Sequence, residues 1–389
     1  MKSKLLEPMT TSQHKPSICI VCHQAYGALC GGDSGHIGGV ERHAAILAHW
    51  LAKDGYDVSM LTWNEGSGEA DVVNGVRVIR ICRKNEGVRG LRFVHPKWTS
   101  LLQGMRRANA DIYYQHGAEC VTGQVALWCG RNGRRFVFNA ANDTDCAANL
   151  PELKTLRERL LYRYGLRHAD LRITQTEEQR AQFLQSFGLD SVVLRYACHD
   201  FAQDTIASQP GAISRRVLWI ARGCRQKRPD RLLDLAELCP EFTFDLVGPF
   251  YPDDYSRSVY ERALRMDNIV LHGAVSRDRV PFFYQKAFCM CCTSDFEGFP
   301  NTFLEAWSHA LPIVSTFDPD SLVATRQLGL VVENVPQMAM ALKSLSTSPV
   351  QYQTIARNAR NYFLGHHTLD AVLPQYETMF GKLAGENGF

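Results

Sequence analysis

Two glutamates, Glu297 and Glu305, stand eight positions apart in the stretch of this chain where residue types and spacing say most about chemistry. An apolar run of strand length, 288–292, precedes them, and Pro300 lies where a helix is expected to begin, a place that tolerates its missing N–H. The turn between strand and helix would therefore present free backbone N–H groups at a helix N-terminus. Such a turn attracts anions, phosphate above all.

Carboxylates beside a phosphate-attracting turn would repel phosphate, so phosphate is not what they are expected to bind. They suit neutral hydroxyl groups on either side of a diphosphate, with a sugar at one end and a ribose at the other. The pattern therefore indicates a nucleotide-sugar site. The alternative is a strand–turn–helix unit whose glutamates only cap the helix and face solvent.

The spacing of the two glutamates, filled with Gly-Phe-Pro-Asn, resembles the donor-site signature of family 4 retaining glycosyltransferases, which have the GT-B fold. The resemblance implies that Glu297 holds the hydroxyls of the transferred sugar and that Glu305 holds the nucleotide ribose. It also implies that the backbone between them meets the diphosphate, over Gly298, Phe299, Pro300 and Asn301.

A basic loop follows the expected strand 217–221 and supplies two candidate phosphate ligands, Arg222 and Lys227, at positions that match the family's phosphate clamp. A leaving nucleoside diphosphate gains negative charge, which fixed cations in a closed cleft stabilise. Arginine forks onto phosphate oxygens, whereas lysine acts as a point charge. A merely solvated basic loop is the alternative, because Arg225 and Arg228 lie in the same stretch.

The glycine-rich loop 31–39 is the second candidate wall of the site. Its end, Gly38 and Gly39, resembles the first-domain loop that approaches the diphosphate and the acceptor from across the cleft in this family. Glycine allows backbone to come close to a ligand. The loop contains no G-x-G-x-x-G, and the chain contains no P-loop pattern. A flexible surface loop, with Glu41 offsetting the helix dipole, is the alternative.

One departure from the family concerns a histidine that often lies near the transferred sugar. The matching region, 136–145, has no histidine, so Asp143 or His116 is expected to join Glu297 as a catalytic residue. Asn142 and Asp145 are further residues that could face the sugar. Each of these could equally make only local hydrogen bonds, as loop Asn and Asp commonly do.

The 389 residues exceed one ordinary core and indicate two domains. Strands and helices alternate in two series, which predicts an α/β fold of two Rossmann-like domains facing a central cleft. We expect an acceptor-side domain at 1–195, a linker at 196–215, a nucleotide-sugar-binding domain at 216–368, and a C-terminal helix at 369–389. That helix either crosses back to the first domain or packs on the second alone. The expected strands are 18–22, 56–62, 75–81, 111–115, 135–139, 171–174, 192–195, 217–221, 242–247, 269–271, 288–293 and 313–315.

Composition narrows the setting of the protein. No apolar run is long enough to span a bilayer, and residues 1–17 lack the apolar core of an export signal, which favours a cytoplasmic location. The 13 cysteines are therefore expected to be reduced thiols. Cys19 and Cys22 lie on an expected strand and point to opposite faces, so they cannot share a metal, and no metal site or cofactor is predicted.

The segment 77–107 is strongly basic, with Glu86 as its only acid and aromatic residues mixed in. Relatives with lipid-linked acceptors often touch anionic membranes with this side of the first domain, and a basic stretch with aromatics suits that. An anionic acceptor or a plain solvated face are the alternatives. No recognisable nucleic-acid-reading module accompanies the charge.

Taken together, the sequence predicts a glycosyltransferase that moves a sugar from a nucleotide-sugar donor, of UDP or GDP type, to an acceptor hydroxyl on a sugar, lipid-linked or glycan acceptor. The resemblance implies that the transfer proceeds with retention. The resemblance implies polysaccharide or glycolipid assembly and no obligatory metal. A nucleotide-sugar epimerase or a sugar phosphorylase on the same scaffold is one alternative. A nucleotide-sugar-binding protein without catalysis is another.

Overall fold

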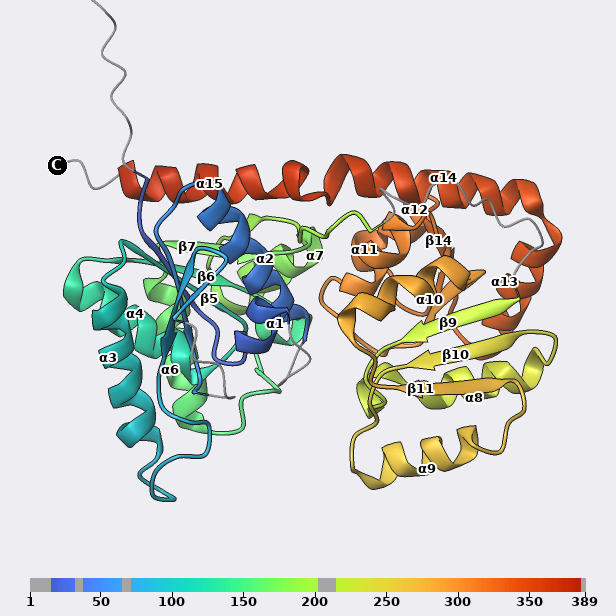
Figure 1. Ribbon diagram of the computed structural model, residues 1–389, viewed down its shortest axis with the longest axis horizontal. Helices are drawn as coiled ribbons and strands as arrows, with labels where there is room; N and C mark the ends of the chain where they lie inside the picture. The colour runs from blue at the N-terminus through green and yellow to red at the C-terminus, as the bar shows by residue number, and fades with distance from the viewer. Residues whose placement is uncertain (1–14, 32–37, 65–70, 202–214, 386–389) are drawn as a thin grey trace, which may run out of the picture.

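The computed structural model describes residues 15–31, 38–64, 71–201 and 215–385. Two α/β units stand side by side, and two long helices run along both of them (Figure 1). Four parts of the expectations lie outside the described residues. They are the start of the N-terminal segment (1–14), the middle of the glycine-rich loop (32–37), most of the linker (202–214) and the last residues (386–389).

The first unit is built on an eight-stranded sheet in the order β3-β4-β2-β1-β5-β6-β7-β8. All neighbouring strands are parallel except β3 and β4. Parallel strands buried on both faces read as apolar runs, which is why the sequence shows them well. The strands are β1 Ile18–Val21, β2 Val58–Thr62, β3 Val72–Val73, β4 Val76–Arg80, β5 Ile112–His116, β6 Arg135–Asn139, β7 Leu171–Thr174 and β8 Val192–Val193.

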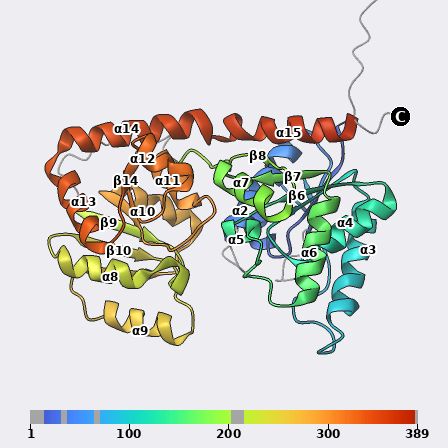
Figure 2. The same ribbon diagram turned by 180° about the vertical axis from the view of Figure 1, so that it is seen from behind.

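Helices cover both faces of this sheet. On one face the core combines residues of α3, α4 and α6, and on the other it combines α2 with α15 (Figure 2). The sheet thus has a separate apolar core on each side. The helices of the first unit are α1 Tyr26–Cys30, α2 Gly39–Lys53, η1 Phe93–Trp98, α3 Thr99–Ala108, α4 Cys120–Asn132, α5 Asp143–Cys146, α6 Leu156–His168 and α7 Glu177–Phe187.

The second unit has a six-stranded, wholly parallel sheet in the order β11-β10-β9-β12-β13-β14. Its strands are β9 Arg216–Ile220, β10 Thr243–Val247, β11 Ile269–Gly273, β12 Cys289–Cys292, β13 Ile313–Ser315 and β14 Gly329–Val331. Its helices are η2 Arg225–Lys227, α8 Pro229–Leu238, α9 Asp254–Ala263, η3 Arg277–Arg279, α10 Val280–Lys286, α11 Asn301–Ser308, η4 Pro319–Ser321, α12 Leu322–Thr325 and α13 Val335–Thr347.

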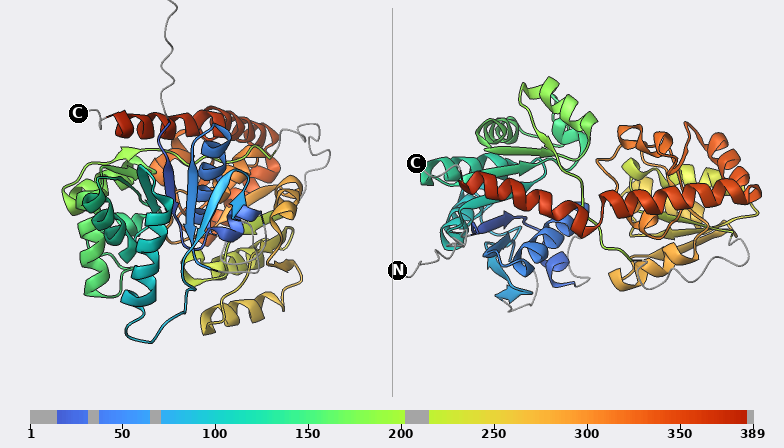
Figure 3. Two further views of the ribbon diagram at one scale, coloured as in Figure 1. Left: turned by 60° about the vertical axis from the view of Figure 1, so that its left-hand side comes forward. Right: turned by 90° about the horizontal axis from the view of Figure 1, so that it is seen from above.

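The chain ends with two helices, α14 Pro349–His366 and α15 Leu369–Gly385, which lie over the second and the first unit respectively (Figure 3). The apolar side of α15 is fully or almost fully buried in the core of the first unit, through Val372, Leu373, Tyr376, Phe380 and Leu383. Of the two placements considered for this helix, the structure therefore has the one that crosses back.

The chain passes between the units twice, near residues 196–198 and near residue 367, and these two segments are hydrogen-bonded to each other. The N–H of Cys198 donates to the carbonyl of His367 at 2.8 Å, and Nδ1 of His367 lies 2.9 Å from the carbonyl of Tyr196. Tyr196, Ala197 and Cys198 are buried. The expected linker began at residue 196, but its first residues belong to the interior. The segment shows no apolar periodicity because it forms neither a helix nor a strand, although its individual side chains are buried.

Cys19 lies in β1 and Cys22 just beyond it, and they contribute to the two different cores of the first sheet. They therefore face opposite sides of the sheet. All 13 cysteines are free thiols. No helix among residues 15–31, 38–64, 71–201 and 215–385 has the length and apolar character needed to cross a membrane.

Candidate active site

The strand order places the candidate residues at one opening between the units. In the second sheet β9 lies between β10 and β12, and in the first sheet β1 lies between β2 and β5. Loops leaving such neighbouring strands in opposite directions open a crevice at their carboxyl ends. A cavity of about 650 Å³ is found there, lined by loops of both units. Among its lining residues are Gly38, Gly39, Arg222, Lys227, Glu297, Gly298, Phe299, Pro300, Asn301 and Glu305.

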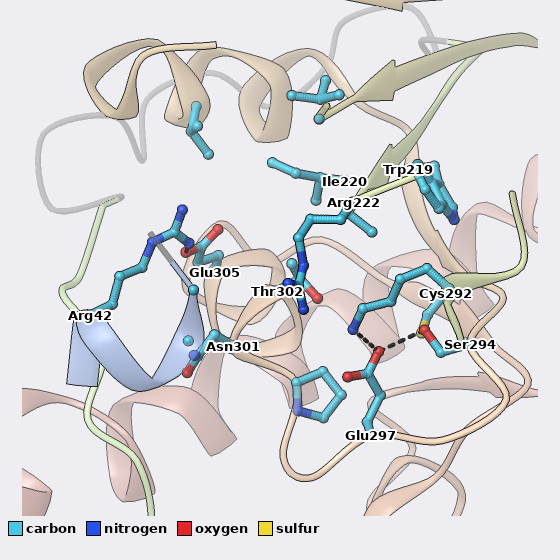
Figure 4. A pocket seen from close by; sticks show the side chains of 18 of the residues that line it. Arg42, Trp219, Ile220, Arg222, Cys292, Ser294, Glu297, Asn301, Thr302 and Glu305 are labelled. Atoms are coloured by element: carbon cyan, nitrogen blue, oxygen red, sulfur yellow. Dashed lines mark hydrogen bonds and ion pairs between the residues drawn. The ribbon is translucent and has the colours of Figure 1, made fainter. Parts of the chain in front are cut away.

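Glu297, in the loop after β12, is buried and paired. One carboxylate oxygen is in close contact with Nζ of Lys227, and it also accepts a 2.6 Å hydrogen bond from the hydroxyl of Ser294 (Figure 4). A buried carboxylate is costly unless it is paired and hydrogen-bonded. The pairing therefore offsets the cost of burying this carboxylate in the wall of the cavity.

The loop that carries Lys227 is tied to the loop that carries Glu297. The hydroxyl of Thr293 donates to the carbonyl of Lys227 at 2.7 Å and accepts from the indole N–H of Trp219 at 2.9 Å. The side-chain amide of Gln226 donates to the carbonyl of Phe296 at 2.9 Å. These bonds fix the cation and the carboxylate relative to the ends of β9 and β12.

Glu305 lies in α11, and its side chain is 3% exposed. Nη2 of Arg277 lies 2.7 Å and Nη1 of Arg42 3.5 Å from one carboxylate oxygen, and the hydroxyl of Tyr284 donates to the other at 2.9 Å. Burial raises the pKa of Glu305, but Arg277 and Arg42 lower it further, so that the pKa lies below its ordinary value. Glu305 is thus an anion held from both sides of the cleft.

The sequence analysis did not single out Arg42 or Arg277. Arg277 opens the short turn η3 after β11, and Arg42 lies on α2 of the first unit. Both line the same cavity as Glu305. The position of Arg277 after a parallel strand of the second sheet was a usable signal. The position of Arg42 depends on the approach of the two units, for which the local sequence offers no signal.

The side chain of Arg222 lies between the two glutamates (Figure 4), and its Nη1 donates to the hydroxyl of Tyr251 at 2.6 Å. The neighbouring cations have other surroundings. Arg225 lies over an aromatic ring and Arg228 pairs with carboxylates outside the cavity. Of the basic residues in this loop, Arg222 and Lys227 are therefore the two that face the cavity.

The backbone expected to meet a diphosphate is only partly available. Helix α11 begins at Asn301, so the N–H groups of its first turn lack carbonyl partners four residues back in the helix. Pro300 has no N–H. The N–H of Phe299 donates to Oε1 of Gln175 at 3.0 Å, across the cleft. All four residues line the cavity, and among them the N–H groups of Gly298 and Asn301 have no recorded partner in the described part of the chain, so that contact of 298–301 with a diphosphate stays a prediction that these two N–H groups would carry.

Two glycines allow the units to approach. A Cβ at position 298 would lie 2.4 Å from the carbonyl oxygen of Ala141, and a Cβ at position 39 would lie 2.5 Å from Nδ2 of Asn301. Both contacts join the first unit to the loop or helix after β12. The N–H of Gly38 donates to the carboxylate of Glu41 at 2.9 Å, so that Glu41 caps the start of α2.

Asp143 does not line the main cavity. It is the first residue of α5, and its Oδ1 accepts a 2.9 Å hydrogen bond from the side chain of Gln179. Burial raises its pKa to about 6, and the nearby carboxylates of Glu178 and Glu297 contribute in the same direction. Its chain neighbour Asn142 lines the cavity, so Asp143 lies next to the cavity wall without reaching the lining.

His116, the last residue of β5, also lies outside the main cavity. It lines a separate cavity of about 30 Å³, which shares Val40 and Glu41 with the large one. Its Nε2 lies 2.6 Å from the hydroxyl of Tyr196. Burial, followed by the neighbouring His43, holds the pKa of His116 well below its ordinary value, so the ring is neutral.

Within the part of the chain that the structure describes, no three His, Cys, Asp or Glu side chains come together in a way that could hold a metal ion. That the donor binds without a metal stays a prediction.

Comparison with known proteins gives two matches along the chain. Residues 38–198 match the glycosyl transferase 4-like domain, and residues 214–348 match the glycosyl transferases group 1 domain. The first segment contains β2 to β8 of the first sheet, and the second contains all six strands of the second sheet. No curated protein sequence matches the chain significantly.

Solved structures resemble the whole molecule at low sequence identity. A sucrose-phosphate synthase from Thermosynechococcus elongatus has a TM-score of 0.77 and 16% identity, with 96% of this chain and 100% of that chain covered. The Anabaena protein HepE, solved in complex with UDP-glucose, has a TM-score of 0.72 and 16% identity over 95% and 100% of the chains. WaaG, a glycosyltransferase involved in lipopolysaccharide biosynthesis, has a TM-score of 0.66 and 16% identity over 93% and 99%. At such identities the likeness establishes a shared GT-B fold.

Replacing Arg222 by alanine should weaken the binding of UDP or GDP at least tenfold, because it removes the cation that lies between the two glutamates. Isothermal titration calorimetry measures this directly. Arg225→Ala is the matched control, since Arg225 belongs to the same loop but does not line the cavity, and its affinity should stay within twofold. If Arg222→Ala binds UDP or GDP as tightly as the control does, Arg222 does not bind the diphosphate.

Proposed function

The chain belongs to the GT-B glycosyltransferases, and we propose that it transfers a sugar from a nucleoside-diphosphate sugar to an acceptor hydroxyl with retention at the anomeric carbon. The observation that carries the proposal is the convergence of Glu297, Glu305, Arg222 and Lys227 on one cavity between the units. The cavity volume of about 650 Å³ lies in the range of small-molecule sites. HepE, which has the same fold, was solved with UDP-glucose, in keeping with a nucleotide-sugar donor here.

In the proposed reaction the acceptor oxygen bonds to the anomeric carbon while the bond from that carbon to the diphosphate breaks. The diphosphate leaves with the electron pair and takes up the proton of the acceptor hydroxyl. Arg222 and Lys227 neutralise the charge that grows on the leaving group, and the start of α11 adds backbone N–H groups. The diphosphate thus acts as the base on the face where the sugar was attached, which gives retention.

The two carboxylates would orient the neutral ends of the donor. Glu297 accepts hydrogen bonds from the sugar hydroxyls, and Glu305 accepts them from the ribose. Lysine carries three N–H donors, so Lys227 can keep its contact with Glu297 and still donate to a phosphate oxygen. Side-chain cations replace a metal in this proposal.

The acceptor is proposed to be a sugar, a lipid-linked sugar or a glycan, in the assembly of a polysaccharide or glycolipid. This setting follows the resemblance of the chain to its family, and it agrees with the description of WaaG as an enzyme of lipopolysaccharide biosynthesis.

The transfer itself is tested by incubating the protein with radiolabelled UDP-glucose or GDP-mannose and a lipid extract. We expect label in the lipid or glycan fraction, with UDP or GDP released in equal amount. Label that appears as a new nucleotide sugar indicates an epimerase, and phosphate-dependent release of sugar phosphate indicates a phosphorylase. Binding without any product indicates a non-catalytic protein, and each of these three results contradicts the proposal.

The ribose role of Glu305 can be separated from simple electrostatics. Glu305→Gln removes a negative charge from a site that binds anions, so pyrophosphate, which has no ribose, should bind equally well or more tightly. UDP or GDP should bind at least fivefold more weakly, because the ribose loses a charged hydrogen-bond acceptor. Isothermal titration calorimetry with pyrophosphate and with UDP or GDP measures the direction of each change in affinity. If both affinities change in the same direction, Glu305 does not hold the ribose.

We also propose a peripheral contact with anionic membranes through residues 83–94, here called the 83–94 surface. It lies at the end of the first unit away from α15 (Figure 1). Not all of the basic segment is free for this, because Arg77 and Arg107 donate to backbone carbonyls within the unit. Apolar side chains stand 56–70% exposed beside exposed cations, which suits a lipid surface. They are Val88, Leu91 and Val94, and the cations are Arg83, Lys84 and Arg89.

This contact predicts sedimentation with phosphatidylserine vesicles at low salt and release at high salt. A basic residue near such a surface contributes about 1 kcal/mol. Replacing Arg83 and Arg89 by glutamine should therefore lower partitioning about thirtyfold, and Leu91→Asp should lower it as well. Leu264→Asp, which changes an equally exposed leucine of the second unit, is the control and should bind like the wild type. No binding to anionic vesicles at low salt contradicts the membrane contact.

A further inference from the structure

The side chain of Gln175 joins three segments at the back of the cleft. Gln175 follows β7, is 2% exposed, and belongs to the first unit. Its Oε1 accepts the N–H of Phe299 from the loop after β12, at 3.0 Å. Its Nε2 donates to the carbonyls of Ala140 and Ala141 at 2.7 and 3.1 Å, and it is also in close contact with the hydroxyl of Tyr196. One amide thus links both units and the first crossing segment.

The partners of Gln175 fix every donor and acceptor in this group. The N–H of Phe299 can only donate and the two carbonyls can only accept, so the amide cannot be turned over. Nε2 of Gln175 cannot accept, so the hydroxyl proton of Tyr196 must point elsewhere. Its acceptor is Nε2 of His116, at 2.6 Å. The hydroxyl of Tyr196, which already accepts from Gln175, satisfies its own proton by donating to His116, and this assigns the proton of the neutral ring to Nδ1.

Nδ1 of His116 has no hydrogen-bond partner of good geometry in the part of the chain that the structure describes, although the carbonyl of Ala140 lies near enough to the ring to raise its pKa against the effect of burial. The ring is 5% exposed and lines the small cavity of about 30 Å³, which has room for one or two waters or a hydroxyl group. Val40 and Glu41 separate this cavity from the donor cavity. The tautomer set by Tyr196 thus leaves an N–H donor facing a space beside the proposed reaction site.

The same group lies at the crossing between the units. The ring of Phe299 packs on the ring of His367 with centroids 5.2 Å apart, and His367 is bonded to the backbone of the Tyr196 segment. Separating the units would break the bond from Phe299 to Gln175. The side chain of Gln175 therefore affects both the position of the donor-binding loop and, through Tyr196, the hydrogen bond of His116.

We propose that Gln175 is a positioning residue that holds the donor loop against the first unit and, through Tyr196, sets the ring of His116 as an N–H donor in the small cavity beside the reaction site. The inference rests on the proposed transferase function for its effect on turnover. The contact itself can be tested without turnover. If Gln175 were only structural, its role would be limited to donating hydrogen bonds to the carbonyls of Ala140 and Ala141, with no effect on His116.

The chain offers two variants that cut the network at different points. Gln175→Met keeps the length of the side chain and removes both its donor and its acceptor. Tyr196→Phe removes only the hydroxyl and keeps the ring, which stacks on His43 with centroids 4.3 Å apart. Asp320→Ala is the control for cross-cleft contacts, since Asp320 accepts the N–H groups of Glu177 and Glu178 without touching Phe299. Tyr113→Phe is the control for losing a buried tyrosine hydroxyl in the core of the first unit.

The first measurement is hydrogen exchange in the protein without ligand. Gln175→Met should raise the exchange rate of the Phe299 amide at least tenfold, whereas Tyr196→Phe, Asp320→Ala and Tyr113→Phe should leave it within threefold of the wild type. Nitrogen-15 shifts of the His116 ring should show the proton on Nδ1 in the wild type and a mixture of tautomers in Tyr196→Phe. An unchanged Phe299 amide in Gln175→Met, or a wild-type ring with its proton on Nε2, overturns the proposal.

The second measurement is kinetic, with whichever of UDP-glucose and GDP-mannose is turned over. Gln175→Met and Tyr196→Phe should each lower kcat at least tenfold while the Kd for UDP or GDP changes less than threefold, and both controls should keep kcat within threefold. If a control variant loses as much kcat as the variant it is matched to, the loss reflects a general loosening of the structure and overturns the positioning role. If neither donor is turned over by the wild type, the transferase proposal fails while the exchange result still decides the contact.

Discussion

The cleft depends on the neutralisation of two carboxylates that are buried before any ligand arrives. Glu297 is matched by Lys227 of the adjacent loop, and Glu305 by Arg277 of its own unit and Arg42 of the other. An unpaired carboxylate at either place would cost several kcal/mol. The loops after β9, β11 and β12 must therefore lie where their charges meet, and α2 of the first unit must come close enough for Arg42 to reach across.

The sheets make this arrangement possible. Because β9 and β12 are neighbours, the loops after them leave the same edge of the sheet and can be bonded to each other, as Thr293 and Gln226 do. The first sheet offers a matching edge at β1 and β5. Glycine at 298 then permits a contact with the backbone of Ala141 that a Cβ would prevent. The strand order and the close approach of the units are thus both needed for the charged groups to pair.

Of the fourteen strands in the described residues, the sequence predicted all but β3 and β14. Parallel strands covered on both faces are short apolar runs, and at β6, β7 and β13 the expected bounds match within a residue. The sequence also indicated the residues of the donor wall, because the loops after β9 and β12 resemble the donor site of a known family. It did not indicate Arg42 or Gln175, which matter only because two separately folded units meet. The burial of Tyr196 was missed for a similar reason. It is packed between elements that lie far apart in the chain.

The expectation that carboxylates beside a phosphate site should repel phosphate is answered by the contacts around them. Four cationic and three acidic side chains line the cavity, and the third acid, Glu41, is engaged by the N–H of Gly38. A diphosphate entering this cavity meets carboxylates whose charge is already balanced, and it meets Arg222, which donates to a tyrosine hydroxyl rather than to a carboxylate. Attraction therefore acts at the centre of the cavity, and the two carboxylates remain available to hydroxyl groups at its ends. A site of this design can select a molecule that is charged in the middle and neutral at both ends, which is the charge distribution of a nucleotide sugar.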